Sequence, residues 1–209
     1  MGDDPKQLVA QGYDRIAQRY LEFAQRNPST ARMTYLRKLF ERLPAQAQVL
    51  ELGCGAGVPC TQLLAQRAQV TGVDISAAQI ALAKLLVPGA TLLQADMMLL
   101  TFPPASFDAV VAFYSIIHLP RTEQTVLIPR LAAWLRAGGW LLANLGTGND
   151  SGSIEPDWLG TPMYWSSHDA QTNLDLVRQA GLTLIETEVL LDDEDGKPVP
   201  FHWILARKA

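Results

Sequence analysis

The sequence predicts a single α/β domain in which helices flank a mostly parallel β-sheet. The chain has 209 residues, a length that suits one core, and 48% of them are apolar, as in a globular protein. From residue 45 onward, short apolar runs alternate with helical stretches, which is the pattern of βαβ units. We therefore expect one domain over residues 1–209, with a helical cap over 1–44 and the core over 45–209.

The first 44 residues predict two helices before any strand. Asp4 can cap the first helix, Pro5 suits its first turn, and apolar side chains recur at steps of three and four as far as Ala24. The second helix is expected to begin near Ser29 and to end at Pro44, which cannot continue it.

Seven apolar runs predict the strands of the sheet, at 48–52, 69–73, 91–95, 107–113, 139–145, 183–190 and 201–206. Between them, helices are expected at 58–66, 76–86, 122–136 and 169–180, and Ser76 with Gln79 predicts a capping box. Asp195-Gly196 is a strong hairpin signal, so the last strand should be antiparallel to its neighbour. Residues 146–167 lack periodicity, and we expect a long loop that walls a binding site.

Composition and charge argue against several partners. The formal net charge is −4, from 17 Lys and Arg against 21 Asp and Glu, so no strong basic field attracts nucleic acid or an anionic membrane. No apolar run approaches the roughly 20 residues of a membrane helix. The first residues do not resemble a secretory signal, and two cysteines make no disulfide framework. We expect a cytoplasmic monomer or homodimer that acts on a small molecule and binds no nucleic acid, membrane or metal ion.

A glycine-rich turn, Glu51-Leu52-Gly53-Cys54-Gly55-Ala56-Gly57, follows the first expected strand. Glycines let backbone amides approach a ligand at the first strand-to-helix turn, where open α/β sheets bind nucleotides. The dinucleotide fingerprint fails, because Val58 and Cys60 stand where it needs a glycine, and no lysine follows for a phosphate loop. A nucleoside without phosphates remains, with Asp74 at the end of the second strand placed to accept from ribose hydroxyls.

These motifs resemble those of the class I S-adenosylmethionine-dependent methyltransferases, a Rossmann-like, seven-stranded family that methylates small molecules. The glycine turn is similar to the family's first motif, and Gln94-Ala95-Asp96-Met97 resembles the segment whose aspartate binds the adenine amine. Residues 107–118 resemble the fourth strand and its active-site end, and 135–142 resemble the turn into the fifth strand, with Ala137 replacing the usual proline. The resemblance implies a Rossmann-like, mostly parallel sheet whose last strand lies in an antiparallel hairpin, and S-adenosyl-L-methionine as the cofactor.

The resemblance assigns the cofactor to the N-terminal helix, the glycine turn and the ends of three strands. The expected cofactor residues are Tyr13, Tyr20, Glu51, Gly53, Cys54, Gly55, Gly57, Asp74, Ile75, Asp96, Met97 and Phe113. Tyr13 and Tyr20 fit a helix that closes over the cofactor in many members, and their spacing of seven places them on one helix face. Anchoring the cap helix to the core is the other role open to this pair.

The methyl acceptor is expected beyond the cofactor's sulfur. His118 is the only histidine at the carboxyl end of an expected central strand, which makes it the candidate general base, and a hydrogen bond that fixes the following loop is the alternative. The expected acceptor residues are Tyr114, Asn144, Trp158, Tyr164 and Trp165, whose rings favour an apolar or aromatic acceptor. We expect methyl transfer to an O, N, S or C nucleophile; the alternative is a fold relative that binds S-adenosylmethionine without methylating.

Overall fold

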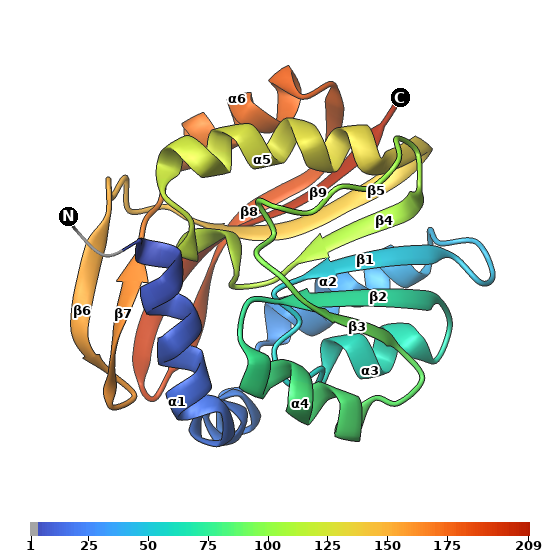
Figure 1. The fold of residues 1–209 in the computed structure, drawn as a ribbon. Helices are drawn as coiled ribbons and strands as arrows, with labels where there is room; N and C mark the ends of the chain where they lie inside the picture. The colour runs from blue at the N-terminus through green and yellow to red at the C-terminus, as the bar shows by residue number, and fades with distance from the viewer. Residues whose placement is uncertain (1–3) are drawn as a thin grey trace.

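The computed structural model describes residues 4–209, and seven of the strands in this range form one sheet in the order β3-β2-β1-β4-β5-β9-β8 (Figure 1). The parallel strands are β1 (Gln48–Leu52), β2 (Gln69–Asp74), β3 (Thr91–Gln94), β4 (Phe107–Ala112) and β5 (Leu135–Gly146). The antiparallel strands are β8 (Leu182–Glu194) and β9 (Lys197–Lys208), and β9 lies between β5 and β8. The predicted seven-stranded sheet with its final hairpin is confirmed.

Helices cover both faces of this sheet (Figure 1). They are α1 (Pro5–Arg26), α2 (Thr30–Phe40), α3 (Cys60–Ala65), α4 (Ala77–Leu86), α5 (Arg121–Trp134) and α6 (Ala170–Gln179), with a short 3₁₀ turn, η1, at Ile116–His118. Alternate residues of each central strand point to opposite faces. Leu50 of β1 therefore joins the core beneath α5 and α6, whereas its neighbour Val49 joins the core beneath α2 and α3.

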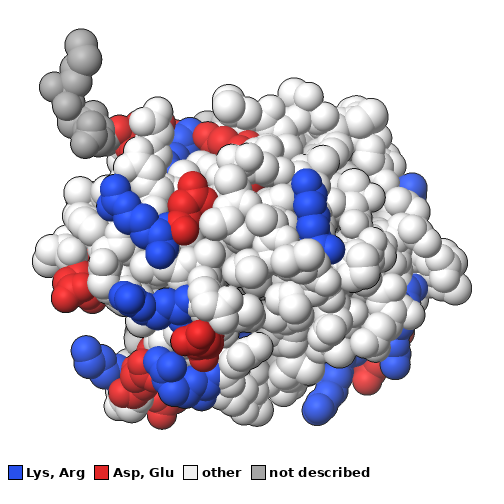
Figure 2. Space-filling model, turned by 60° about the horizontal axis from the view of Figure 1, so that its bottom comes forward, with Lys and Arg blue, Asp and Glu red and all other residues white. Residues whose placement is uncertain are grey.

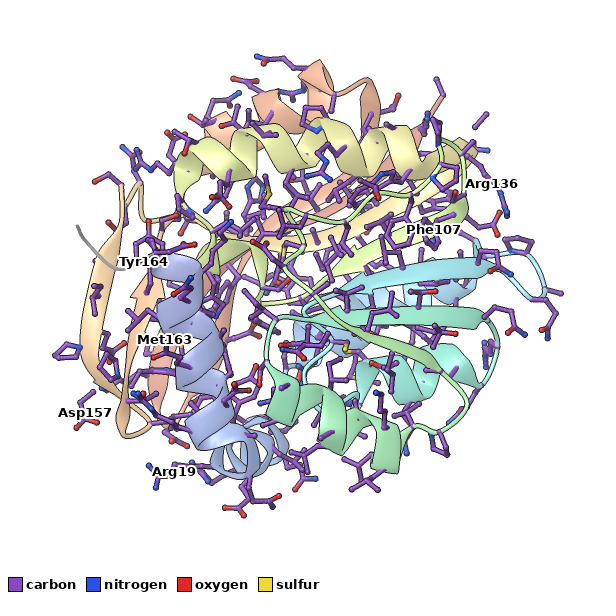
Figure 3. The ribbon with its side chains drawn as sticks, viewed as in Figure 1. Arg19, Phe107, Arg136, Asp157, Met163 and Tyr164 are labelled. Carbon is purple, nitrogen blue, oxygen red and sulfur yellow. The ribbon has the colours of Figure 1, made fainter. Side chains whose placement is uncertain are left out.

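The main difference from the predicted fold lies after β5. Residues 146–167 were expected to form a long loop, but β6 (Ser153–Trp158) and β7 (Thr161–Trp165) pair as an antiparallel ribbon. Its period-2 pattern is hard to see in the sequence, because Pro156 interrupts β6 and every side chain of β6 except that of Trp158 is exposed. The ribbon stands apart from the large sheet and packs on α1, as Met163 and Tyr164 beside that helix show (Figure 3).

The hairpin between β8 and β9 reaches the far end of α1. Asp195 and Gly196 both have positive φ angles (52° and 85°), as a tight hairpin turn requires. The guanidinium of Arg26 donates two hydrogen bonds of 3.0 Å to the carboxylate of Asp195. The end of α1, the hairpin tip and the β6–β7 ribbon thus lie around one region of the molecule.

The surface carries charges of both signs. On the face seen in Figure 2, basic and acidic side chains lie interspersed, and much of the surface is uncharged. No helix within residues 4–209 is both long enough and apolar enough to pass through a membrane.

Candidate active site

The glycine turn begins at the carboxyl end of β1, between β2 and β4, where the strand order reverses and open α/β sheets bind ligands. The backbone N–H groups of Gly53 and Cys54 both donate to the carbonyl of Val73, at 2.7 and 2.9 Å. Gly53 has a φ of +71°, and a Cβ added there would lie 2.2 Å from the Cβ of Ser115. Packing alone therefore requires a glycine at this position.

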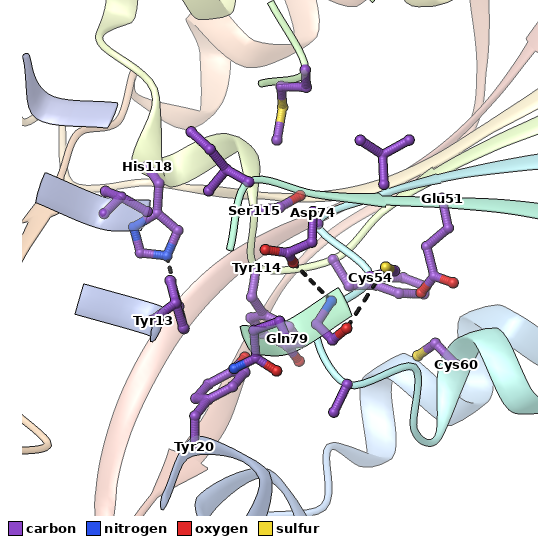
Figure 4. A pocket seen from close by; sticks show the side chains of 18 of the residues that line it. Tyr13, Tyr20, Glu51, Cys54, Cys60, Asp74, Gln79, Tyr114, Ser115 and His118 are labelled. Atoms are coloured by element: carbon purple, nitrogen blue, oxygen red, sulfur yellow. Dashed lines mark hydrogen bonds between the residues drawn. The ribbon is translucent and has the colours of Figure 1, made fainter. Parts of the chain in front are cut away.

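At Gly55 a side chain would cause no clash within the protein, but it would occupy the space where a ligand binds. The φ of Gly55 is +54°, and an added Cβ would lie 3.8 Å from Gln79 Oε1 and 3.9 Å from Tyr20 Cε1. The space above Gly55 belongs to a cavity enclosed by α1, the glycine turn and the ends of β1, β2, β3 and β4 (Figure 4). The third glycine, Gly57, lies outside this cavity, because its backbone packs against Val87 and Ala83 instead.

This first cavity brings together the other residues that were predicted to bind the cofactor. Its walls include Tyr13, Tyr20, Glu51, Gly53, Cys54, Gly55, Asp74, Ile75, Asp96, Met97 and Phe113. Of the predicted acceptor and catalytic residues, Tyr114 and His118 also face it. Residues from five separate segments of the chain thus converge on one enclosed space.

Asp74 lines the first cavity and is held in place by two backbone hydrogen bonds. Its Oδ2 accepts a hydrogen bond from the backbone N–H of Gly55 (2.8 Å), and its Oδ1 accepts from that of Ser76 (2.9 Å). Burial raises the pKa of its carboxyl to about 6. Each carboxylate oxygen has a further lone pair, so the ionised side chain can also accept from ligand hydroxyls.

Asp96 also lines the first cavity and is bound to Lys6 of α1. Its Oδ1 accepts from the N–H of Met98 at 2.8 Å, and its Oδ2 lies 2.7 Å from the ammonium of Lys6, which also reaches Glu123 at 3.1 Å. Lys6 is a site residue that the sequence does not single out. A lysine near a helix start carries no signal for a partner 90 positions away.

Gln79 is a second residue that the sequence analysis did not assign to the site. The Oγ of Ser76 accepts from the backbone N–H of Gln79 (3.1 Å), which is half of the predicted capping box, but the Gln79 side chain makes no return bond. That side chain is 1% exposed, and neither of its amide atoms has a hydrogen-bond partner among the described residues. It lines the cavity beside Gly55, where a ligand would satisfy it.

Glu51 and the two cysteines are buried on the β1 side of the cavity. The Oγ1 of Thr61 donates to Glu51 Oε2 at 2.7 Å, and burial raises the pKa of Glu51 to about 7. Burial also raises the pKa of both Cys54 and Cys60 well above the usual thiol range. Both thiols therefore stay protonated at neutral pH and are poor nucleophiles.

Tyr13 and His118 form a hydrogen-bonded pair at the edge of the first cavity (Figure 4). Nδ1 of His118 lies 2.9 Å from the carbonyl oxygen of Tyr164, which can only accept, so Nδ1 carries the proton. Nε2 is then an acceptor for the phenol of Tyr13, 2.9 Å away. Burial lowers the pKa of His118 to about 4, so its ring is neutral at neutral pH.

A second cavity opens next to the first, between the end of α1, the β6–β7 ribbon and the β8–β9 hairpin. Its volume of about 640 Å³ is within the range of about 300–1,000 Å³ that small-molecule sites occupy. Trp158 and Trp165 line it, as predicted, and the buried indole N–H of Trp165 has no partner within residues 4–209. Tyr13, Tyr20, Arg32 and Tyr114 line both cavities, so ligands in the two would meet there.

Two predicted acceptor residues lie elsewhere. Asn144 is fully buried, lines neither cavity, and accepts a 2.6 Å hydrogen bond from the backbone N–H of Tyr114 through Oδ1. Tyr164 turns its ring toward α1, into a cluster with Val9 and Ile16, and serves the site only through its carbonyl. Both predictions were wrong: β5 turns Asn144 inward, and strand alternation in β7 points Tyr164 away from Trp165.

Comparison with known proteins agrees with this geometry. A methyltransferase-domain family model matches residues 49–139. A sterol 24-C-methyltransferase from Gibberella zeae is 28% identical over 76% of this chain and 45% of its own length. A trans-aconitate 2-methyltransferase from Delftia acidovorans is 40% identical over 58% of this chain and 45% of its own length. The chain thus spans about half the length of these curated relatives.

Solved structures show the same architecture over the whole chain. The magnesium protoporphyrin IX methyltransferase from Synechocystis PCC 6803, with bound S-adenosylmethionine, superposes with a TM-score of 0.73. The superposition covers 99% of this chain and 98% of that one at 17% identity, so it establishes the fold. The family match over residues 49–139, from β1 into β5, shows that this part of the chain is similar to a methyltransferase domain.

Proposed function

We propose that the protein transfers the methyl group of S-adenosylmethionine to a small molecule bound in the second cavity. The observation that carries the proposal is the junction of the two cavities at Tyr13, Tyr20, Arg32 and Tyr114. A methyl group must pass in line from sulfur to a nucleophile at close range, and two adjoining cavities allow that alignment.

The residues of the first cavity fit the cofactor. Asp74 and the unpaired amide of Gln79 offer hydrogen bonds to ribose hydroxyls, and Ile75 and Met97 offer apolar contact to the adenine. Asp96 offers an acceptor to the adenine amine, although Lys6 already occupies one of its oxygens. Glu51 and the N–H of Gly55 border the end that remains for the methionine portion.

When bound, the cofactor supplies an electrophilic methyl on a positively charged sulfur. The methyl–sulfur bond would break with its electron pair left on sulfur as the acceptor's nucleophile bonds to the methyl carbon, and Tyr13, Tyr20, Arg32 and Tyr114 would border these atoms. If the nucleophile is a hydroxyl or amine, its proton must leave. Tyr13 is placed to receive that proton while its own phenol proton passes to the unprotonated Nε2 of His118. Burial lowers the pKa of His118 to about 4, so the imidazole is a weak base and would hold this proton only briefly.

The substrates named for the relatives are a sterol and trans-aconitate, which differ too much in chemistry to define this acceptor. The test is formation of S-adenosylhomocysteine from S-adenosylmethionine with a panel of phenols, thiols, amines and carboxylic acids, beside calorimetric binding of S-adenosylhomocysteine. Turnover with one acceptor class supports the proposal. Cofactor binding without turnover on a broad panel would favour the non-methylating alternative, and no binding would refute both.

A further inference from the structure

We propose that the acceptor carries a cationic group, a protonated amine or a quaternary ammonium, on an apolar body and is methylated at a separate nucleophilic atom. The inference rests on the proposed function, in which the second cavity holds the acceptor. The second cavity is lined by carboxylates on one side and by aromatic rings on the other, and each set favours a positive charge.

The carboxylates come from two separate segments. In β6, Ser153, Glu155 and Asp157 line the cavity, whereas Ile154 does not and is 59% exposed. A register shift between Glu155 and Trp158 breaks the alternation, so that Asp157 and its neighbour Trp158 both line it. The tip of the β8–β9 hairpin contributes a second set. Together the acidic lining residues are Asp150, Glu155, Asp157, Asp192, Asp193, Glu194 and Asp195, against the basic residues Arg32 and Lys197.

Some of these carboxylates have partners in the protein. Arg26 forms a salt bridge with Asp195, and Asp192 accepts hydrogen bonds from Ser29 and from the phenol of Tyr114. Across residues 4–209, however, no basic side chain forms a salt bridge with Glu155, Asp157 or Glu194. These three supply the negative charge that the fold leaves uncompensated.

Glu194 shows that the two acidic segments face each other. Its side chain is half-buried, and burial raises its pKa, with further contributions from Asp192, from Glu155 across the cavity and from Asp195. Mutual repulsion of this kind raises the cost of ionisation. A cation between the hairpin and the ribbon would remove that cost and bind with a charge-assisted hydrogen bond.

The aromatic side of the second cavity is an independent observation. The rings of Tyr20 and Phe23 on α1 lie 5.7 and 6.1 Å from the Trp158 ring, at interplanar angles of 48° and 70°. Trp165 lies 5.2 Å from Trp158 at 83°. All four rings line the second cavity, and aromatic faces attract an ammonium or guanidinium group.

Arg32 and Lys197 do not neutralise the negative charge of the second cavity near Trp158. Arg32 lies at the junction with the first cavity, with its guanidinium 5.5 Å from the Tyr114 ring. Lys197 is exposed at the end of the hairpin, beyond the ring cluster. An anionic acceptor would therefore lie among carboxylates in the space near Trp158, where like charges disfavour it.

The test uses probes that share a phenyl body and differ in charge: phenethylamine, phenethyltrimethylammonium, 2-phenylethanol and 3-phenylpropionate. Binding to the protein saturated with S-adenosylhomocysteine is followed by tryptophan fluorescence and calorimetry. We expect both cations to bind at least about tenfold more tightly than the alcohol, and the carboxylate to bind more weakly still. Equal or tighter binding of the alcohol or carboxylate, or no binding of the cations at millimolar concentration, would overturn the inference.

Variants test whether the acidic residues of the second cavity cause the preference for cations. E155Q combined with E194Q should reduce the preference for cations over the alcohol to about threefold or less, while binding of the alcohol changes little. The control is E188Q, which removes an exposed carboxylate of β8 that does not line the cavity and should leave the preference intact. Displacement of the cationic probes by millimolar Mg²⁺ or Ca²⁺ with equal efficiency would instead assign the cluster to a metal ion and refute the inference.

Failure of this inference differs from failure of the proposed function. If S-adenosylhomocysteine binds and a neutral or anionic acceptor is methylated, the proposed function stands and the cationic acceptor class falls. If S-adenosylhomocysteine does not bind at all, the proposed function itself falls, whatever the probes do.

Discussion

The phenol of Tyr13 and Nε2 of His118 lie 2.9 Å apart, although the two residues are 105 positions apart in the chain. Tyr13 comes from the middle of α1, and His118 ends the 3₁₀ turn that follows β4. The pair is buried at the edge of the first cavity, and Tyr13 also lines the second. It therefore connects the proposed reaction centre to the only strand-end histidine that the sequence offered as a base.

Replacing His118 by Ala should slow methylation of a phenol or alcohol by about a hundredfold or more if His118 receives the proton, because proton transfer by a positioned group contributes that much. Tyr13→Phe should act in the same direction, since it interrupts the same relay. Steady-state kinetics should show a fall in kcat, with affinity for S-adenosylhomocysteine changed less than about threefold. A thiolate acceptor, which has no proton to lose, should be methylated nearly as fast by both variants; an equal loss with a thiolate would assign the pair a structural role.

Cofactor affinity should depend on the ionisation of Asp74. Burial raises its pKa to about 6, and only the ionised form offers all its oxygen lone pairs to the ribose. Affinity for S-adenosylhomocysteine should therefore weaken as pH falls from 7 to 5, and binding should release protons near pH 6. Calorimetry of Asp74→Asn should give weaker binding, by about 1.5–3 kcal/mol, with the acid dependence lost. A surface control, Asp175→Asn, should retain the wild-type profile.

Glu51 should make the unliganded protein less stable as pH rises. Its pKa is raised from 4.5 in the unfolded chain to about 7 in the fold by burial, so between these values only the folded state holds the proton. The free energy of unfolding should then fall across this window by roughly 3 kcal/mol from this residue. Urea unfolding at pH 5 and pH 8 measures the effect. Glu51→Gln should be more stable than wild type at pH 8 and equal to it at pH 5; a parallel shift at both pH values would contradict the assignment.

The two glycines at the start of the turn should respond differently to alanine. Gly53→Ala places a Cβ 2.2 Å from the Cβ of Ser115, so the variant should be destabilised by several kcal/mol or fail to fold. Gly55→Ala meets no such clash and should lose only about 1–2 kcal/mol to its positive φ. The folded Gly55→Ala protein should nevertheless bind the cofactor poorly. Partial recovery of Gly53→Ala by Ser115→Gly would confirm the cause of the first effect.

Gln79→Leu should separate binding from stability. The buried amide of Gln79 has no partner in the described chain, so an apolar side chain of similar size should leave thermal stability unchanged or slightly higher. Affinity for S-adenosylhomocysteine should fall about tenfold, because a hydrogen bond to the ligand is lost. Unchanged affinity would show that Gln79 does not contact the nucleoside.

The large sheet was predictable because its signals are local. Each parallel strand is an apolar run of a few residues, and the Asp195-Gly196 turn specifies its hairpin in two positions. The β6–β7 ribbon carries no such signal: Glu155, Asp157 and Ser153 face a cavity and not a core, so the strand lacks a hydrophobic face of its own. Its apolar contacts come instead from α1, nearly 150 positions earlier.

The residues of the candidate site also differ in how clearly the sequence indicates them. The glycine turn, Asp74 and Asp96 follow directly from strand ends, and all three line the cofactor cavity. Gln79 escaped notice because its backbone does serve the predicted helix cap, while its side chain serves the cavity. Asn144 shows the opposite error, since a strand of period 2 offers two faces and the sequence does not say which one meets the ligand.

The attachment of α1 bears on the order in which molecules enter and leave. Lys6 binds Asp96, Asp14 accepts from Ser76 and Ala78, and Arg19 donates to the carbonyl of Leu159, so the helix is fastened along its length over the cofactor cavity. We expect the nucleoside to exchange only when these links open, whereas the second cavity is bordered by exposed residues of the ribbon and hairpin. With the proposed function, this attachment predicts an ordered turnover in which the donor enters first, acceptors exchange over it and the spent nucleoside leaves last.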